Sequence, residues 1–328
     1  MHGHGTSAGA VSALGPAQWL VLLVVAGAVL AYLAGVSRLR GVAWPLSRLL
    51  AWIGGWTCVG AALVGPLAER AHHDFTAHMA GHIALGMLAP LMLVFAAPVT
   101  LLLRVLPTAR ARPVARALAS RPAAVVTHPL TAALLDVGGL WLLYRTRLHA
   151  ATMTGPWPHL AVSAHVLAAG YLFTFAVLGR PDPAPHRAPI GWRAGTLVAA
   201  VAAHDILAKV LYAYPPAGVP AEQARRAGEL MYYGGAPVEI ALIVLLCRDW
   251  LGRAPRTRPR RSSPGRRTSL SGWAPSWFCC PVCGVAGMRS PGRGCATCSR
   301  SSPTTSVPVV APPGSWTSCG RGSSPPIR

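Results

Sequence analysis

Histidine and methionine residues open the apolar stretch HMAGHIALGMLAPLMLVFAAPVTLLLR, which runs from His78 to Arg104. His78 and His82 are spaced i, i+4, so on one helix their side chains point the same way, with Met79 beside them and Met87 about a turn deeper. Imidazole and thioether groups suit Cu(I), whereas hard cations prefer oxygen ligands. This spacing therefore indicates copper chemistry, with a purely structural role for the two histidines as the open alternative.

Histidines on two other apolar stretches extend this set. His165 and His204 are expected to reach a similar depth once the stretches fold as neighbouring helices. The candidate copper ligands are therefore His78, Met79, His82, Met87, His165 and His204. Each histidine taken alone also fits an interhelical hydrogen bond, so the prediction depends on the set as a whole.

Charged residues inside the apolar stretches are the second feature with chemical potential. A charged side chain at the centre of a bilayer costs roughly 2.5–3.5 kcal/mol on insertion scales, so such residues are usually kept for a reason. Asp205 with Lys209 at i+4 is interpreted as a structural ion pair, with a proton relay as the alternative. Asp136 and Glu239 fit either a partner for a buried cation or part of a conduction path, and the sequence leaves both readings open.

The elements that must position these residues are long apolar helices. Of the 328 residues, 52% are hydrophobic and 12% are charged, and the apolar residues form uninterrupted blocks rather than amphipathic stripes. The net charge of +21 does not indicate a nucleic acid partner, because the arginines lie mostly between the apolar blocks and in the C-terminal tail. The sequence therefore predicts an all-α, polytopic transmembrane helix bundle in a lipid bilayer, followed by a disordered tail.

Seven apolar blocks are each long enough to cross about 30 Å of hydrocarbon. They cover residues 18–36, 46–65, 81–103, 125–144, 159–179, 192–212 and 230–247. The predicted domains are an extracytoplasmic segment 1–17, a seven-helix transmembrane domain 18–252 and a tail 253–328. Lys and Arg concentrate in the odd-numbered connections and the tail, which places the N-terminus outside and the C-terminus in the cytoplasm. Of the twelve histidines, only His128 and His186 then fall on the inner side.

The tail beyond residue 252 has a different composition, in which Arg, Ser, Pro and Gly dominate and Asp, Glu, Lys and Tyr do not occur. Such a segment cannot bury enough apolar surface to offset the entropy of ordering it. Two CxxC pairs, Cys280 with Cys283 and Cys295 with Cys298, could close a tetrahedral zinc site. The acid-free surroundings argue against zinc, because a shifted reading frame of a GC-rich gene would encode a similar composition. A disordered or aberrant tail is the favoured interpretation.

Three stretches resemble the CtaG family of cytochrome c oxidase assembly factors, which are polytopic proteins of bacterial plasma membranes. They are the stretch from His78 to Arg104, HLAVSAHVLAAGYLFTFAVLGRPDP from His159 to Pro183, and EQARRAGELMYYGGAPVEIALIVLLCRDW from Glu222 to Trp250. Between the last two lies the position where the family has a histidine-bearing helix, here with His204. The resemblance covers about residues 18–252. It implies a role in assembling the haem-copper oxidase, as an aid to copper delivery.

The candidate ligands, the charged residues and the family resemblance leave two functions open. The first is a non-enzymatic assembly factor or metallochaperone of the bacterial plasma membrane, which assists copper delivery to cytochrome c oxidase subunits through an outer-face His/Met site. The second is a membrane transporter of copper or another small solute, which the charged residues inside the apolar stretches favour. The sequence contains no nucleophile motif, phosphate loop or paired-carboxylate signature of an enzyme. A homo-oligomer in which each copy supplies half of the ligands stays open.

Overall fold

The computed structural model describes residues 14–39 and 43–252, and this part of the chain consists of helices without any strand. Six helices are long and apolar enough to cross a membrane: α1 (Pro16–Ser37), α2 (Leu46–Leu63), a long helical segment (Phe75–Val105), α12 (Pro156–Leu178), α13 (Ile190–Ala213) and α14 (Ala221–Leu251). A shorter helix lies where the fourth apolar block was predicted, and it consists of α9 (Pro129–Ala133), η2 (Leu134–Gly138) and α10 (Gly139–Arg145). The all-α membrane bundle predicted from the sequence is confirmed.

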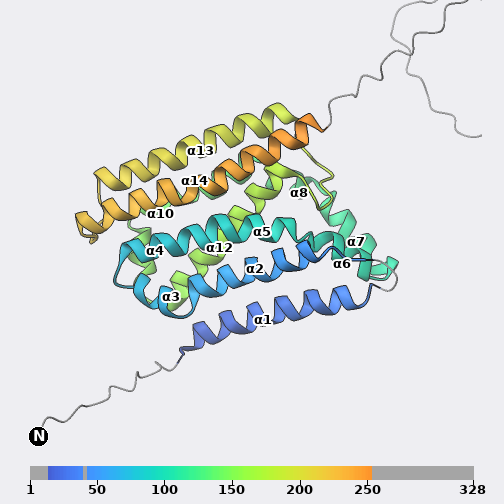
Figure 1. Cartoon of the computed structure of the whole chain (residues 1–328), viewed down its shortest axis with the longest axis horizontal. Helices are drawn as coiled ribbons and strands as arrows, with labels where there is room; N and C mark the ends of the chain where they lie inside the picture. The colour runs from blue at the N-terminus through green and yellow to red at the C-terminus, as the bar shows by residue number, and fades with distance from the viewer. Residues whose placement is uncertain (1–13, 40–42, 253–328) are drawn as a thin grey trace, which may run out of the picture. The chain divides into compact units, whose positions relative to one another are not determined.

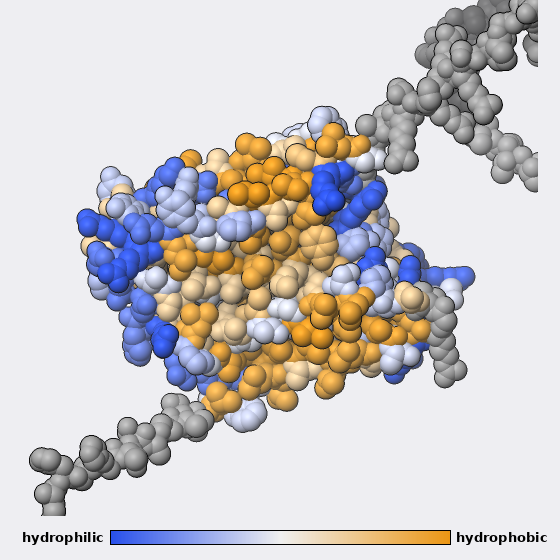
Figure 2. Space-filling model, viewed as in Figure 1, coloured by the Kyte–Doolittle hydropathy of each residue, from blue (hydrophilic) through white to orange (hydrophobic). Residues whose placement is uncertain are grey.

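The long helices run side by side (Figure 1). In the view of Figure 2, a broad hydrophobic band separates hydrophilic surface at the two ends of the bundle. Large apolar side chains are exposed on the long helices and on α10, for example Leu23, Leu142 and Val198, each more than 60% exposed. An outward apolar surface of this kind is suited to lipid, so the chain is a multi-pass membrane protein.

Each end of the bundle is named here after its most characteristic side chains. The histidine end consists of the connections 64–74, 146–155 and 214–220, which carry the short helices α3 (Pro66–Ala71) and α11 (Leu148–Thr152). The arginine end consists of the connections 106–128 and 179–189, which carry α7 (Thr108–Leu118) and α8 (Arg121–Val126). Of these four short helices, α3, α7 and α11 lie outside the seven predicted apolar blocks, and α8 overlaps the fourth block only at residues 125–126.

Two helices begin earlier than the apolar blocks indicated. The third begins at Phe75 rather than near residue 81, because the Asp74 carboxylate accepts a hydrogen bond from the Thr76 amide at 2.9 Å and so caps the first turn. The last begins at Ala221 rather than near residue 230, because its first turns are polar and a hydropathy pattern does not detect them. The earlier start of the third helix includes His78 and His82 in one helix.

The third long segment is the centre of the fold. It consists of α4 (Phe75–His82), the π-helix η1 (Ile83–Leu88), α5 (Ala89–Phe95) and, after a break, α6 (Pro98–Val105), and it packs against α2, α12 and α14. Pro90 has no amide hydrogen, and in a regular helix its ring would meet the carbonyl of Gly86. The wider π-helical turn accommodates this proline. Gly170 of α12 packs against the Gly86 carbonyl, which a Cβ atom on Gly170 would overlap.

Buried ionic contacts join α12, α13 and α14 near the arginine end. The guanidinium of Arg193, which is 1% exposed, donates to the carbonyls of Val177 and Leu178 at 2.6 and 2.9 Å. Asp249 of α14 accepts from Arg187 at 2.6 Å and from Arg193 at 3.3 Å. The two arginines thus satisfy the last carbonyls of α12 and tie the three helices together.

Candidate functional site

A small buried cavity of about 40 Å³ lies between the two π-helical segments and helices α12, α13 and α14. We call it the deep cavity. Its titratable lining residues are His82, Asp136, His204 and Glu239, and Met87 also lines it. The volume is enough for a single ion or a water molecule.

The imidazole of His204 is the centre of this arrangement. Its Nδ1 atom lies 2.9 Å from Oε1 of Glu239 without the alignment of a hydrogen bond, and its two ring nitrogens have no hydrogen-bond partner among the described residues. The rings of His82 and His204 are stacked with centroids 6.3 Å apart, and Nε2 of His82 is also buried and unpaired. Buried polar atoms are normally paired, so Nε2 of His82 and Nε2 of His204 are positions that a bound ion would satisfy.

Met87 approaches the same imidazole across the backbone of Gly235. A Cβ atom on Gly235 would lie 3.1 Å from Cε1 of His204 and 3.3 Å from Sδ of Met87. The absence of a side chain on α14 at this position therefore leaves room for both the thioether and the imidazole next to the backbone of Gly235. The thioether adds a soft donor to a set of imidazole and carboxylate groups.

Asp205 lies close to His204 and Glu239 and does not form the predicted ion pair with Lys209. Ligand atoms of His204, Asp205 and Glu239 all lie within 4.8 Å of one another. The predicted Asp205–Lys209 pair is not among the ion pairs of the described residues, because the Lys209 ammonium lies 5.1 Å from the ring centroid of Tyr232 instead. This prediction was wrong, and the carboxylate remains beside the deep cavity.

The π-helical turns decide which side chains reach the cavity. Met87 belongs to η1, which directly follows His82, and Asp136 belongs to η2. A π-helical turn has more residues than an α-helical turn, so it rotates the side chains that follow, and such turns are frequent at functional sites. The regular 3.6-residue period used for the sequence prediction could not place Met87 relative to His82.

A second cavity, of about 50 Å³, lies between the deep cavity and the histidine end. Its polar lining residues include His78, Tyr144, His159 and Ser163, and it also borders His82. His82 therefore lines both cavities, whereas His78 lines only the second. The i, i+4 pair predicted as one set of ligands is divided between two neighbouring sites.

Two members of the predicted copper set line neither cavity. Met79 is completely buried in an apolar cluster with Phe75 and Met231, where its side chain fills space in the core. His165 is exposed, and its Nε2 atom lies 3.2 Å from the carbonyl oxygen of Leu135. The structure thus brings together His82, Met87 and His204, and it separates them from Met79 and His165.

The sequence prediction missed His149 as a site residue. This histidine lies in the short helix α11, is 7% exposed, and has a buried Nδ1 atom without a hydrogen-bond partner among the described residues. Burial and, second, the charge of nearby His159 lower the pKa of its imidazole, which favours the neutral form of the ring. The only sequence signal was its position shortly after the fourth apolar block, in a connection predicted to face outward.

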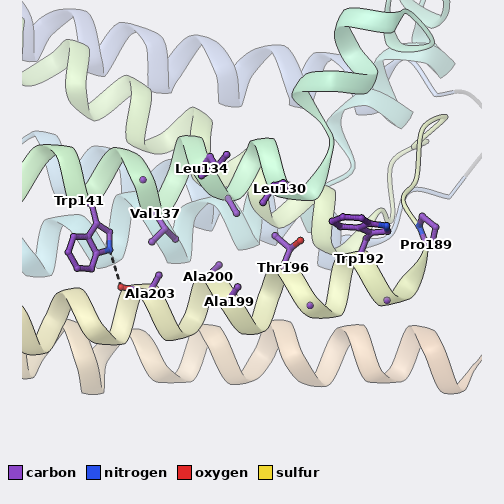
Figure 3. A pocket seen from close by; sticks show the side chains of 14 residues that line it. Leu130, Leu134, Val137, Trp141, Pro189, Trp192, Thr196, Ala199, Ala200 and Ala203 are labelled. Atoms are coloured by element: carbon purple, nitrogen blue, oxygen red, sulfur yellow. Dashed lines mark hydrogen bonds between the residues drawn. The ribbon is translucent and has the colours of Figure 1, made fainter.

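A larger cavity of about 710 Å³ lies between α13 and the shorter helix of α9, η2 and α10 (Figure 3). Its walls are apolar or small side chains, including Leu134, Val137 and Ala199, and its lining contains no His, Cys, Asp or Glu. Nε1 of Trp141 donates to the carbonyl of Ala203 at 3.1 Å, which closes one end (Figure 3). This cavity offers space for hydrocarbon but no metal ligand.

The described cysteines do not contribute to these sites. Cys58 and Cys247 carry free thiols, and neither lines the deep cavity or the second cavity. The four cysteines predicted as a zinc site, Cys280, Cys283, Cys295 and Cys298, lie outside the described residues.

Comparison with known proteins identifies relatives in mycobacteria. An uncharacterized protein of Mycobacterium bovis and one of Mycobacterium tuberculosis are each 39% identical over 196 residues, which is 56% of this chain and 29% of the relative. One from Mycobacterium leprae is 36% identical over 184 residues, 53% of this chain and 28% of the relative. The chain thus covers less than a third of the length of these relatives, and no solved structure matches it significantly. The profile of the cytochrome c oxidase caa3 assembly factor family (Caa3_CtaG) matches residues 30–253, so the chain belongs to this family.

Proposed function

We propose that this protein assists the assembly of cytochrome c oxidase in the bacterial plasma membrane by holding copper in the deep cavity and delivering it to oxidase subunits. Membership of the caa3 assembly factor family supports the oxidase as the partner. The observation that carries the copper part is the convergence of His82, Met87, His204 and Glu239 on one buried cavity. Copper is here the cargo of the protein, and no catalytic step is proposed.

The donor atoms of the deep cavity support copper over harder cations. Two imidazoles and a thioether form a set that suits Cu(I), while Mg²⁺ and Ca²⁺ prefer cages of oxygen atoms. The carboxylate of Glu239 next to His204 adds one negative charge that offsets part of the charge of the metal. A set of mixed donors in a small cavity is compatible with a metal that has to be released again.

The distribution of arginines supports the proposed orientation. Arginines dominate the connections at the arginine end, which therefore faces the cytoplasm by the positive-inside rule. The histidine end then faces outward. In this orientation the second cavity lies on the side of the deep cavity that faces the cell exterior.

A transporter of copper or another small solute is the competing function. A transport path would have to continue from the deep cavity to the arginine end. In the described structure the contacts of Arg187 and Arg193 with Asp249 lie across the interface of α12, α13 and α14 on that side. This closed interface favours delivery from one face of the membrane over transport through the protein.

Gene deletion followed by complementation tests the proposed function. Deletion should lower oxidase activity at unchanged total cell copper, and the wild-type chain should restore the activity. The double variant His82→Ala/His204→Ala should insert into the membrane but not restore it, whereas the matched control His165→Ala should restore it, because His165 is exposed and lines neither cavity. A change in total cell copper that precedes the loss of oxidase would support the transporter. Full complementation by the double variant would refute the proposal that copper is delivered through the deep cavity.

A further inference from the structure

A group of four histidines lies at the histidine end, separate from the deep cavity. We call it the histidine cluster, and its members are His72, His78, His149 and His159. The ring centroids of His78 and His149 are 5.0 Å apart, those of His78 and His159 are 6.4 Å apart, and those of His72 and His159 are 5.9 Å apart. Three separate elements and one connection supply these rings, so the tertiary fold alone brings them together.

These distances agree with imidazoles that share one metal ion. With metal–nitrogen bonds of about 2.0–2.1 Å, the centroids of two rings on one tetrahedral metal lie roughly 5–6 Å apart. The ring of His149 lies within this range from His78 at 5.0 Å, whereas the ring of His159 lies slightly beyond it at 6.4 Å. Three ring nitrogens of these histidines do not lie within 4.8 Å of one another in the described structure, so metal binding requires the side chains to rotate toward a common point.

Two further observations, on His149 and His78, indicate that these histidines bind a ligand rather than only pack. His149 is 7% exposed, yet its Nδ1 atom has no hydrogen-bond partner among the described residues. Nε2 of His78 lies 3.2 Å from the hydroxyl of Tyr144, and in the tautomer in which Nε2 is the donor the lone pair of Nδ1 is free. Metal-bound histidines usually have their second nitrogen held by such a partner, which fixes the ring.

The histidine cluster lies between the protein surface and the deep cavity. A pocket of about 530 Å³ at the histidine end is bordered by His72, His73 and His149. The second cavity, bordered by His78 and His159, follows, and His82 forms its boundary with the deep cavity. An ion that enters from the surface pocket therefore meets the cluster before it can reach His82.

We propose that the histidine cluster is a second metal site, which binds a copper ion at the surface and passes it through His82 to the deep cavity. This proposal rests on the proposed function, because it assigns the entry step to a separate set of ligands. The transfer needs only exchange of imidazole ligands, so the oxidation state of the metal does not change and no other reactant takes part.

The number of bound copper ions tests the proposal on the full chain, purified in detergent and titrated with Cu(I) against a competing chelator. We expect His149→Gln/His159→Gln to bind one copper ion fewer than the wild type. The variant His204→Gln/Glu239→Gln should also lose one ion, from the deep cavity. The control His165→Gln should lose none. Copper bound by cysteines is the same in all variants, so it cancels in these differences.

Unchanged copper binding by His149→Gln/His159→Gln would overturn the histidine cluster as a metal site. Loss by this variant with unchanged binding by His204→Gln/Glu239→Gln would instead refute the deep cavity and leave the cluster. Because His149 is buried, its replacement could also unfold the protein, so His72→Gln serves as a second variant at an exposed position. It should fold normally and weaken one copper ion by about tenfold or more. Wild-type affinity for every copper ion in this folded variant would likewise contradict the proposal.

Discussion

Replacement of Gly170 by alanine should destabilise the centre of the bundle. The added Cβ atom would overlap the carbonyl oxygen of Gly86 and lie 2.9 Å from Cγ of Pro90. Neither group can rotate away, because one is backbone and the other is a ring, so α12 has to move away from η1. Overpacking of this kind costs about 1–3 kcal/mol. For a chain of this size we expect the Tm to fall by about 2–12 °C.

Gly60→Ala is the matched control, because a Cβ atom at Gly60 of α2 would meet no atom within 4 Å. There alanine should leave the Tm unchanged or raise it, since alanine favours a helix over glycine by about 1 kcal/mol. Thermal unfolding of both purified variants in detergent, followed by circular dichroism, measures the difference. A Gly170→Ala variant that melts at or above the Gly60→Ala control would refute the close contact of η1 with α12.

Three further substitutions test contacts elsewhere in the fold. Asp249→Asn leaves the buried guanidinium of Arg193 without its carboxylate, so the unfolding free energy should fall by about 3 kcal/mol. An unchanged Tm of this variant would contradict that expectation. Tyr144→Phe removes the hydrogen bond to His78 and should lower the unfolding free energy, measured by chemical unfolding, by about 0.5–1.5 kcal/mol. In the copper titration, the same variant should bind the copper ion of the histidine cluster more weakly. Asp182→Ala removes the acceptor of three hydrogen bonds at the start of α6 and should lower the unfolding free energy by about 1–2 kcal/mol. Wild-type stability of this variant would mean that these hydrogen bonds contribute nothing.

The sequence alone determined the class of fold and most of the membrane helices. Their lengths follow from the thickness of the bilayer, and a lipid-facing helix must be apolar along its whole length, so hydropathy detects it without knowledge of its neighbours. The polar starts of the helices at Phe75 and Ala221 escaped this signal, since they lie where apolar side chains are not required. The resemblance to the assembly factor family was also read from local stretches of sequence, and the family match over residues 30–253 confirms it.

The composition of the candidate site was decided by the tertiary structure. His82, Met87 and His204 were named from the sequence, but so were Met79, which packs in the apolar core, and His165, which is exposed and lies against the Leu135 carbonyl. Their sequence spacing assumed a regular helix, and the π-helical turn η1 changes the direction of the side chains after His82.

The histidine cluster depends still more on long-range packing. His149 lies 71 positions after His78 in the printed sequence, yet their rings are 5.0 Å apart. Periodicity describes which side chains of one helix share a face, but it contains no information on which helices become neighbours or how they are rotated. Those choices are made by close contacts such as that of Gly170 with the Gly86 carbonyl, because two backbones can approach each other only where no side chain lies between them.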